Sequence, residues 1–191
     1  VVGGLWTLID MRGTIKSGIK KAIGADVSGD MGSLPRTEQD IPMNRAVIAL
    51  GVIAFLTFIF YWWKTGSLLL AIVGGIFLSF TAFFFSAVAG YIAGVVGSSN
   101  TPVYGITIAT IMATTLVVWL VGGVVLGMAQ TDLMYATLII ASIVAVNAAI
   151  AGDVMQDLKT GHLLGATPWK QQIAELIGVL VGAVVAPLTL T

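Results

Sequence analysis

The feature that most constrains this chain is a stretch of 67 residues, from 65 to 131, that contains no Asp, Glu, Lys or Arg. A helix needs roughly 20 consecutive apolar residues to cross a bilayer, so at least two crossings fit into this stretch alone. The whole chain is also apolar, with 9% charged residues and a mean hydropathy of +1.01, whereas an ordinary soluble domain has about 25% charged residues. The sequence therefore predicts an all-α, polytopic bundle of transmembrane helices.

Hydropathy and helix breakers divide the chain into about five spans. The spans are expected at residues 45–63, 67–97, 105–127, 133–152 and 168–191. Residues 1–9 are expected to be the end of a truncated transmembrane helix, and residues 98–105 a break between two helices. The first span ends in Tyr61, Trp62 and Trp63, which we expect to form an aromatic anchor at the membrane interface.

The basic residues predict the orientation of the bundle. Six of the nine Lys and Arg side chains lie between residues 10 and 45, and cytoplasmic loops carry an excess of such residues. Residues 10–44 are therefore expected to form a basic cytoplasmic loop before the transmembrane region at 45–191. Within this loop, residues 24–42 have the Gly-, Asp-, Ser- and Pro-rich composition of a flexible linker. The six cations are Arg12, Lys16, Lys20, Lys21, Arg36 and Arg45.

Charge and composition exclude several kinds of function. The nine acidic and nine basic side chains cancel, so net charge gives no reason to expect a nucleic-acid partner. The sequence has no cysteine, which excludes disulfides, thiolate metal sites and thiol catalysis within it. We expect a protein that is not an enzyme and that has no cofactor and no metal site.

Small residues recur at four-residue spacing, which lets helix backbones approach closely where lipid supplies no hydrophobic driving force. The spacing predicts a multi-helix bundle and carries no information about cargo. The residues are the pairs Gly90 and Gly94, Gly123 and Gly127, Gly178 and Gly182, and the row Ala141, Ala145 and Ala149.

Two polar segments interrupt the apolar chain, and the first coincides with the expected helix break. Its Thr-Pro pair predicts a helix N-terminus, whose free backbone N–H groups favour an anionic group such as a carboxylate. If the break lies within the membrane, it must face protein or a water-filled cavity, because lipid cannot satisfy open backbone. The alternative is a cytoplasmic surface loop with an ordinary helix cap. The candidate substrate-binding residues are Ser98, Ser99, Asn100, Thr101 and Tyr104.

The second polar segment holds Asp153, Gln156, Asp157 and His162. The two aspartates are four residues apart, which places both carboxylates on one helix face. Close acids at a membrane boundary can accept protons, and histidine titrates near neutral pH, so these residues are candidates for proton coupling or gating. The alternative is a capping box, with Asp153 as the N-cap and Gln156 three residues later, at the start of a surface helix. One His and two Asp at this spacing are a weak metal-ligand set.

Three runs of the sequence stand out: residues 98–107 read SSNTPVYGIT, residues 149–172 read AIAGDVMQDLKTGHLLGATPWKQQ, and residues 36–43 read RTEQDIPM. These runs resemble the oligopeptide transporter family, particularly its prokaryotic and yellow-stripe-like branch. The second run is long and specific, and together the runs extend the resemblance to nearly the whole chain. Tyr104 departs from the family pattern, which has a smaller residue at this position, so the resemblance leaves the size of the cargo open.

The resemblance implies a secondary active carrier of the cell membrane, driven by protons, that imports oligopeptides or metal chelates such as nicotianamine and phytosiderophore complexes. It also implies that the chain is a fragment whose partners include the remaining helices of the carrier and membrane lipid. In that carrier, residues 98–104 would line a central cavity. Residues 153–162 would form a cytoplasmic gate controlled by protonation.

Two other functions are compatible with parts of the sequence. A channel-like pore is one, although rings of charge that would line a pore are missing. An intramembrane aspartyl protease is the other, because Ala151, Gly152 and Asp153 come within one residue of a Gly-x-Gly-Asp motif. Asp132 or Asp157 would then supply the second carboxylate.

Overall fold

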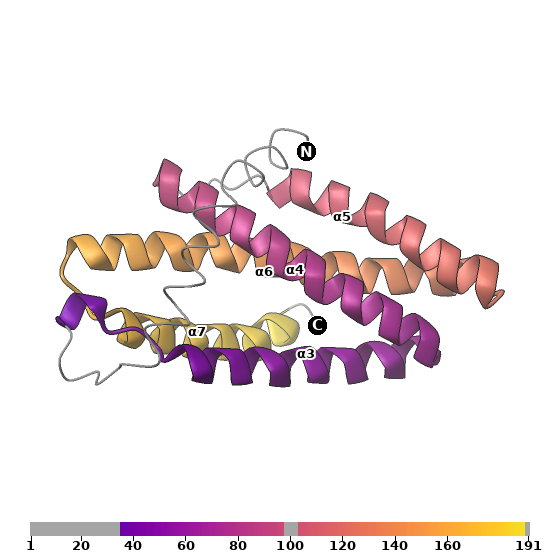
Figure 1. The fold of residues 1–191 in the computed structure, drawn as a ribbon, viewed down its shortest axis with the longest axis horizontal. Coiled ribbons are helices and arrows are strands. Elements are labelled where there is room, and N and C mark those ends of the chain that lie inside the picture. The colour runs from indigo at the N-terminus through magenta and orange to yellow at the C-terminus, as the bar shows by residue number, and fades with distance from the viewer. Residues whose placement is uncertain (1–34, 98–102, 190–191) are drawn as a thin grey trace.

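The computed structural model of the protein describes residues 35–97 and 103–189, and all regular structure within these ranges is helical. Five of the described helices are long and apolar enough to cross a membrane, which confirms the predicted polytopic all-α class (Figure 1). They are α3 (Met43–Thr65), α4 (Leu68–Val96), α5 (Val103–Val118) with its π-helical continuation η2 (Trp119–Val125), α6 (Gln130–Leu163) and α7 (Pro168–Thr189). A short 3-10 helix, η1 (Arg36–Glu38), precedes α3.

Some of the predicted segments are not described by the structure. The expected truncated helix at residues 1–9 and most of the basic loop at residues 10–44 lie outside the described residues. The described helix ends fall within a few residues of the expected spans, with one exception. Helix α6 continues to Leu163 instead of ending near residue 152.

A glycine in the left-handed region ends each of the first two long helices. Gly66 follows α3 with a φ of 66°, and its N–H donates to the Trp62 carbonyl at 2.9 Å. The next residue, Ser67, caps α4 by accepting a hydrogen bond from the Leu70 N–H at 3.4 Å. Because glycine adopts this φ without steric cost, the chain reverses between two spans within two residues.

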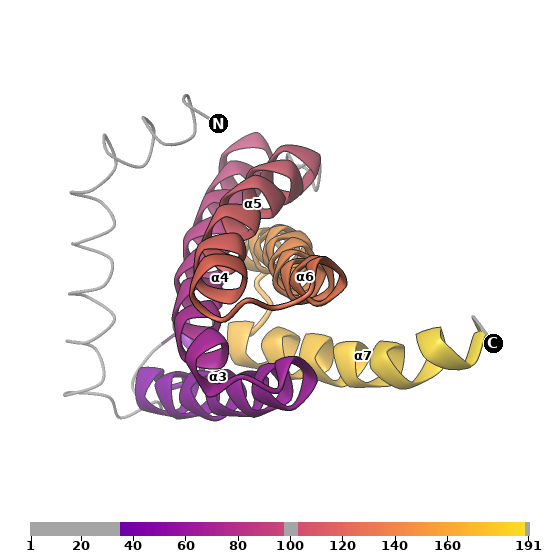
Figure 2. The same ribbon diagram turned by 90° about the vertical axis from the view of Figure 1, so that its right-hand side faces the viewer.

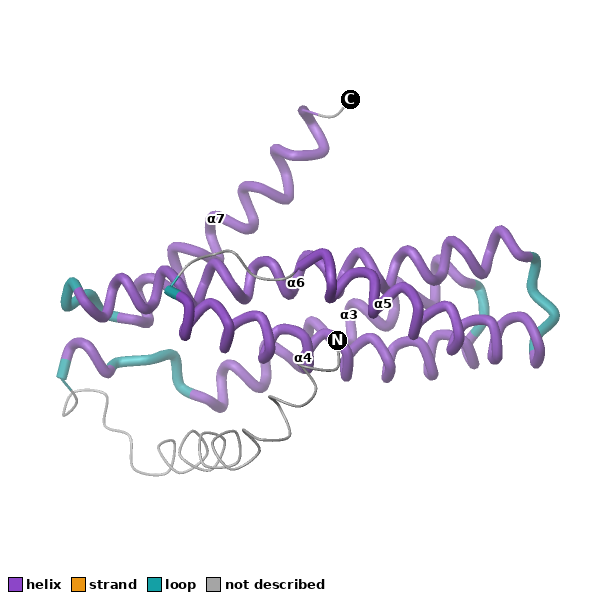
Figure 3. The backbone as a smooth tube through the Cα atoms, turned by 90° about the horizontal axis from the view of Figure 1, so that it is seen from above, coloured by secondary structure: helices purple, strands orange, loops and turns teal. Residues whose placement is uncertain are grey.

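Helices α4 and α6 pack against each other as the central pair of the bundle. Helix α5 lies against both of them, and α3 packs on α4, as the view along the bundle shows (Figure 2). Helix α7 contacts the end of α6 and then diverges from the other helices (Figure 3). None of its described residues is buried.

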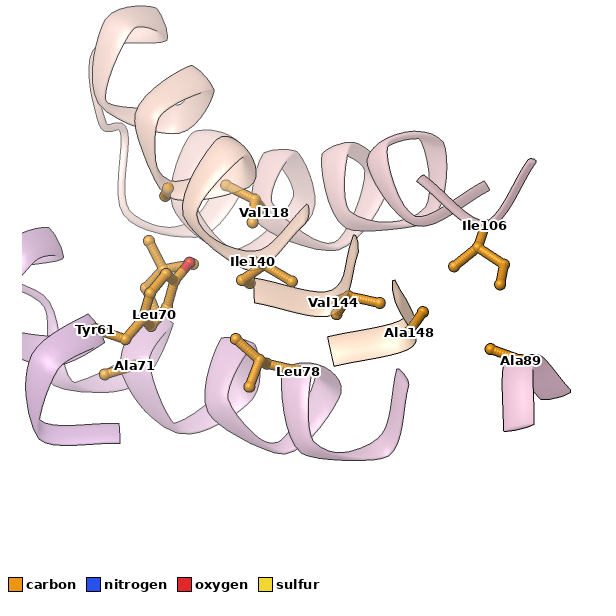
Figure 4. Packing of buried hydrophobic residues seen from close by; sticks show 11 residues of the cluster. Tyr61, Leu70, Ala71, Leu78, Ala89, Ile106, Val118, Ile140, Val144 and Ala148 are labelled. Carbon is orange, nitrogen blue, oxygen red and sulfur yellow. The ribbon is translucent and has the colours of Figure 1, made fainter. Parts of the chain in front are cut away.

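The core is a row of small and branched residues on α6 that faces α4 and α5. Ala136, Ile140, Val144 and Ala148 recur every four residues and are 0% exposed. They belong to one cluster with buried residues of α4 and α5 (Figure 4). The expected alanine row is only partly confirmed, because Ala141 is buried whereas the next two alanines of that row are half-buried.

The expected aromatic anchor is wrong for its first residue. Tyr61 is 1% exposed and packs against Gly74 of α4, whereas Trp62 and Trp63 are exposed. The Tyr61 hydroxyl is buried and has no hydrogen-bond partner among the described residues. Tyr61 therefore fills the space between α3 and α4, and the two tryptophans keep the predicted position at the helix end.

We expect Gly74→Ala to destabilise the protein. A Cβ at this position would lie 2.6 Å from Tyr61 Cε1, so the ring or one of the two helices has to move. Overpacking of this kind costs about 1–3 kcal/mol. The measurement is the thermal unfolding midpoint of the detergent-solubilised protein. Gly51→Ala is the matched control, because no described residue lies within 4 Å of its added Cβ; equal midpoints for the two variants would contradict this packing.

Candidate functional site

The predicted helix break separates α4 from α5. Helix α4 ends at Val96, followed by Gly97 with a φ of 68°, and α5 begins at Val103. Of the candidate substrate-binding residues, Ser98, Ser99, Asn100 and Thr101 lie outside the described residues. Tyr104, in the first turn of α5, is 89% exposed.

The start of α5 does not lie level with the end of α4. Ile106, in the first turn of α5, lies beside Ala89 of α4 in the buried cluster (Figure 4). Ala89 is seven residues before Val96, which is about 10 Å along a helix. The same offset is visible in Figure 1, where α5 starts part-way along the bundle. The first turn of α5 therefore lies deeper in the bundle than the last turn of α4.

The second predicted polar segment forms the last third of α6. Because α6 is one continuous helix with Ala129 as its N-cap, the capping-box interpretation of Asp153 is wrong. Asp153, Asp157 and His162 are exposed, and Gln156 is half-buried. The two aspartates lie one helical turn apart, as their spacing predicts. Among the described residues, no group of three or more acidic, His or Cys side chains is arranged to hold a metal ion.

The last two turns of α4 pack on this part of α6. A Cβ at Gly90 would lie 3.0 Å from Met155 Cγ, so the absence of a side chain allows the close contact. One turn further along α4, the Gly94 carbonyl accepts a hydrogen bond from Lys159 Nζ at 3.2 Å. A cation at this position interacts favourably with the partial negative charge at a helix C-terminus.

A polar contact in the middle of the bundle was missed by sequence reasoning. Asn147 Nδ2 of α6 donates to Ser86 Oγ of α4 at 2.7 Å and to the Ala82 carbonyl at 3.3 Å. A single Asn inside an apolar run was the available signal, because such residues link helices in membranes.

Sequence reasoning also missed a set of polar residues that joins α6 to α7. Gln171 Nε2 donates to the Asp157 carbonyl at 3.2 Å. The Gln171 amide lies where a Cβ of Gly161 would be, so this contact requires glycine at position 161. One turn further along α7, Glu175 is half-buried, and the Asp157 carboxylate acts on it electrostatically. In the sequence, the signal that could have identified Glu175 was its position as a single carboxylate in an otherwise apolar run.

The segment before α3 is attached to the start of α7, which corrects the linker interpretation for residues 35–42. The Trp169 N–H donates to the Gln39 carbonyl at 3.1 Å. Gln172 Nε2 donates to Asp40 Oδ1 at 2.9 Å, and Gln172 Oε1 accepts from the Ile41 N–H at 3.4 Å. Two runs of the sequence that resemble the transporter family, residues 36–43 and 149–172, are therefore in contact.

The geometry contradicts the carboxylate pair that a protease would need. Asp132 and Asp153 lie on the same helix, 21 residues apart, which corresponds to about 30 Å. Asp157 follows Asp153 on that helix, so the two acids cannot face each other across a substrate.

Comparison with known proteins identifies the family. The family model described as OPT oligopeptide transporter protein matches residues 3–191. A Haemophilus influenzae protein, named provisionally as an oligopeptide transporter, is 34% identical over 200 residues. That match covers 97% of this chain and 31% of the relative, so the chain spans about a third of the relative's length.

Plant relatives match shorter parts of the chain. Metal-nicotianamine transporter YSL2 of Arabidopsis thaliana is 46% identical over 67 residues, which is 35% of this chain and 9% of the relative. Iron-phytosiderophore transporter YSL15 of Oryza sativa subsp. japonica is 41% identical over 54 residues, which is 28% of this chain and 8% of the relative. No solved structure matches the chain. Because the family model covers nearly all of its residues, this membrane-spanning chain belongs to the OPT oligopeptide transporter family.

Proposed function

We propose that this chain is part of a secondary active carrier that moves oligopeptides or metal-chelate complexes across the cell membrane, driven by a proton gradient. Membership of a transporter family and five candidate membrane spans support this proposal. The relatives bear names of oligopeptide, metal-nicotianamine and iron-phytosiderophore transporters. The chain covers 31% of its Haemophilus influenzae relative, so the proposed activity requires the remaining helices of the carrier.

The offset between α4 and α5 carries the proposal for the substrate site. A helix that begins below the end of its neighbour presents its free N–H groups toward the interior of the bundle. Carriers build substrate sites from such discontinuous helices, with helix N-termini directed at anionic groups of the substrate. We therefore assign Ser98, Ser99, Asn100, Thr101 and Tyr104 to the wall of the substrate cavity, where they receive carboxylates of a peptide or a chelate.

The contact between α4 and α6 supports a proposed gate next to this cavity. In the proposal, Asp153, Gln156, Asp157 and His162 lie on the cytoplasmic side, and Asp153, Asp157 and His162 bind and release protons while Gln156 lies beside the two carboxylates. Lys159 connects this part of α6 to the last turn of α4, directly before the break. A movement of α6 would therefore be transmitted to the last turn of α4, which precedes the proposed substrate site.

The test is substrate protection of single cysteines in the full-length carrier. Cysteines at Ser98, Asn100, Tyr104 and Ile108 are labelled with a water-soluble thiol reagent, with and without a mixture of peptides or a metal chelate. We expect labelling of all four sites and at least a several-fold slower rate when transported substrate is present. Residues 104, 108, 112 and 116 share one face of α5. A cysteine at Leu116 therefore serves as the control that shows how far along this face the reagent can reach.

Two results would contradict the site. Free labelling that substrate does not change would make the break an ordinary surface loop. Complete absence of labelling at all four positions would place it in lipid or packed protein. Saturable uptake that is lost without a proton gradient separates a carrier from a channel-like pore.

A further inference from the structure

Helix α7 carries one carboxylate within an apolar span. Glu175 is the only acidic residue between 168 and 191, and it lies seven residues beyond the start of α7 at Pro168. An ionised carboxylate at such a position is costly, and ionisable residues inside spans face the protein interior and serve a function. Here Glu175 lies one turn beyond Gln171, which contacts α6, and within electrostatic range of Asp157.

Two hydrogen-bond acceptors on this side of α7 have no donor within the described part of the chain. Gln171 and Glu175 are four residues apart, so their side chains are neighbours on one helix face. Oε1 of each residue is buried without a hydrogen-bond partner among the described residues. The Gln171 amide is oriented by its other atom, Nε2, which donates to the Asp157 carbonyl. The amide therefore cannot turn to offer its N–H groups to Glu175 without losing that bond.

We infer that Glu175 and Gln171 form a proton-binding site, in which Glu175 is held as the neutral carboxylic acid and donates a hydrogen bond to Gln171 Oε1. A buried acceptor without a donor costs about 1–3 kcal/mol. A carboxylate only accepts hydrogen bonds, whereas a carboxylic acid also donates one. One bound proton thus supplies the donor that both oxygen atoms lack.

The charged groups around this site favour the neutral form. From α6, the Asp157 carboxylate is close enough to act on Glu175 electrostatically, and it disfavours a second negative charge. From the segment before α3, Asp40 bonds to Gln172 on the adjacent part of α7. On α7 itself, the Lys170 ammonium lies over the Trp169 ring, 5.7 Å from its centroid. Among the described residues, no cation is seen to compensate an ionised Glu175.

Loss of the proton would weaken the contact between α6 and α7. Two acceptor oxygens would then oppose each other beside a second carboxylate, and α7 is held to α6 there by the Gln171 bond. Because α7 also holds residues 39–41, its release would move the cytoplasmic segment before α3. This inference rests on the proposed proton-driven carrier. It adds Glu175 as a further protonation site beside the proposed gate residues Asp153, Asp157 and His162.

The experiment is infrared spectroscopy of the full-length carrier in lipid nanodiscs at neutral pH, without substrate. We expect the carbonyl stretching band of a protonated carboxylic acid, and we expect Glu175→Gln to remove that band. Gln171→Met keeps Glu175 but removes its acceptor, so the band should move to the higher frequency of an acid without a hydrogen bond. Gln172→Met is the matched control, because Gln172 contacts residues 40 and 41 instead.

Each outcome decides for or against the site. Identical carboxylic acid bands in the parent protein and in Glu175→Gln would refute it. If Glu175→Gln does not fold, an unchanged band in Gln171→Met refutes it equally. The spectrum is independent of transport, so a carrier that takes up no peptide or chelate can still show the band. Proton-driven uptake without a Glu175 band would refute this inference and leave the proposed function standing.

Discussion

A carrier in which Gly161 is replaced by leucine is expected to lose most of its transport while it still inserts into the membrane. The Gln171 side chain occupies the position of a Cβ on Gly161. A leucine there must push α7 away from α6 or expel Gln171 from its bond to the Asp157 carbonyl. Overpacking costs about 1–3 kcal/mol, and the loss of the Gln171 bond adds about 1 kcal/mol. The measurements are surface expression and the initial rate of substrate uptake.

A second substitution tests whether the clash is the cause. Gly161→Leu combined with Gln171→Ala removes the side chain that occupies the site, so part of the uptake and of the thermal stability should return. Gly178→Leu is the control on α7, because nothing within the described structure lies within 4 Å of its added Cβ. Full uptake by Gly161→Leu alone would mean that α6 and α7 do not pack in this way during transport.

Reversal of the charge at Lys159 is expected to give the second largest effect. In the structure, Lys159 Nζ donates to the Gly94 carbonyl in the last turn of α4. A glutamate would instead place a negative charge beside the partial negative charge of that helix end. The change from attraction to repulsion is worth about 1–2 kcal/mol. Because α4 leads directly into the break, we expect weaker apparent substrate affinity together with a lower unfolding temperature.

The control separates the charge from the packing of the side chain. Lys159→Met retains an apolar stem of similar length and removes only the charge and the donor. It should therefore lie between the parent protein and Lys159→Glu in both measurements. If methionine and glutamate have the same effect, the helix-end interaction does not position α4 and only the lost hydrogen bond matters.

The continuity of α6 shows what hydropathy can and cannot predict. The apolar run ends before Gly152 and Asp153, so the sequence predicts the end of a span there. Hydropathy reports where the chain leaves lipid, whereas a helix continues wherever its backbone hydrogen bonds continue. Helix α6 extends to Leu163 and is contacted beyond Asp153 by α4 and α7, through Lys159 and Gly161. Those contacts come from distant parts of the chain and leave no local signal.

The candidate site also has some features that local sequence predicts and others that only helix packing shows. The break before α5 and the one-turn spacing of Asp153 and Asp157 follow from local sequence, because a Thr-Pro pair and four-residue spacing act within one helix. Glu175 appears in the sequence only as one acid in an apolar run. Its partners Asp157 and Gln171 became evident from the packing of α7 on α6.

The sequence by itself determined that the protein is a multi-pass helical membrane protein, roughly where its spans lie, and which family it resembles. These properties are local, because each span must satisfy its own backbone hydrogen bonds and match the lipid around it. Only the tertiary structure decided which helices are neighbours, that Tyr61 faces inward, and that residues 35–42 hold the start of α7. Such contacts depend on shape and on pairs such as Asp40 and Gln172, 132 residues apart, and local hydropathy cannot encode them.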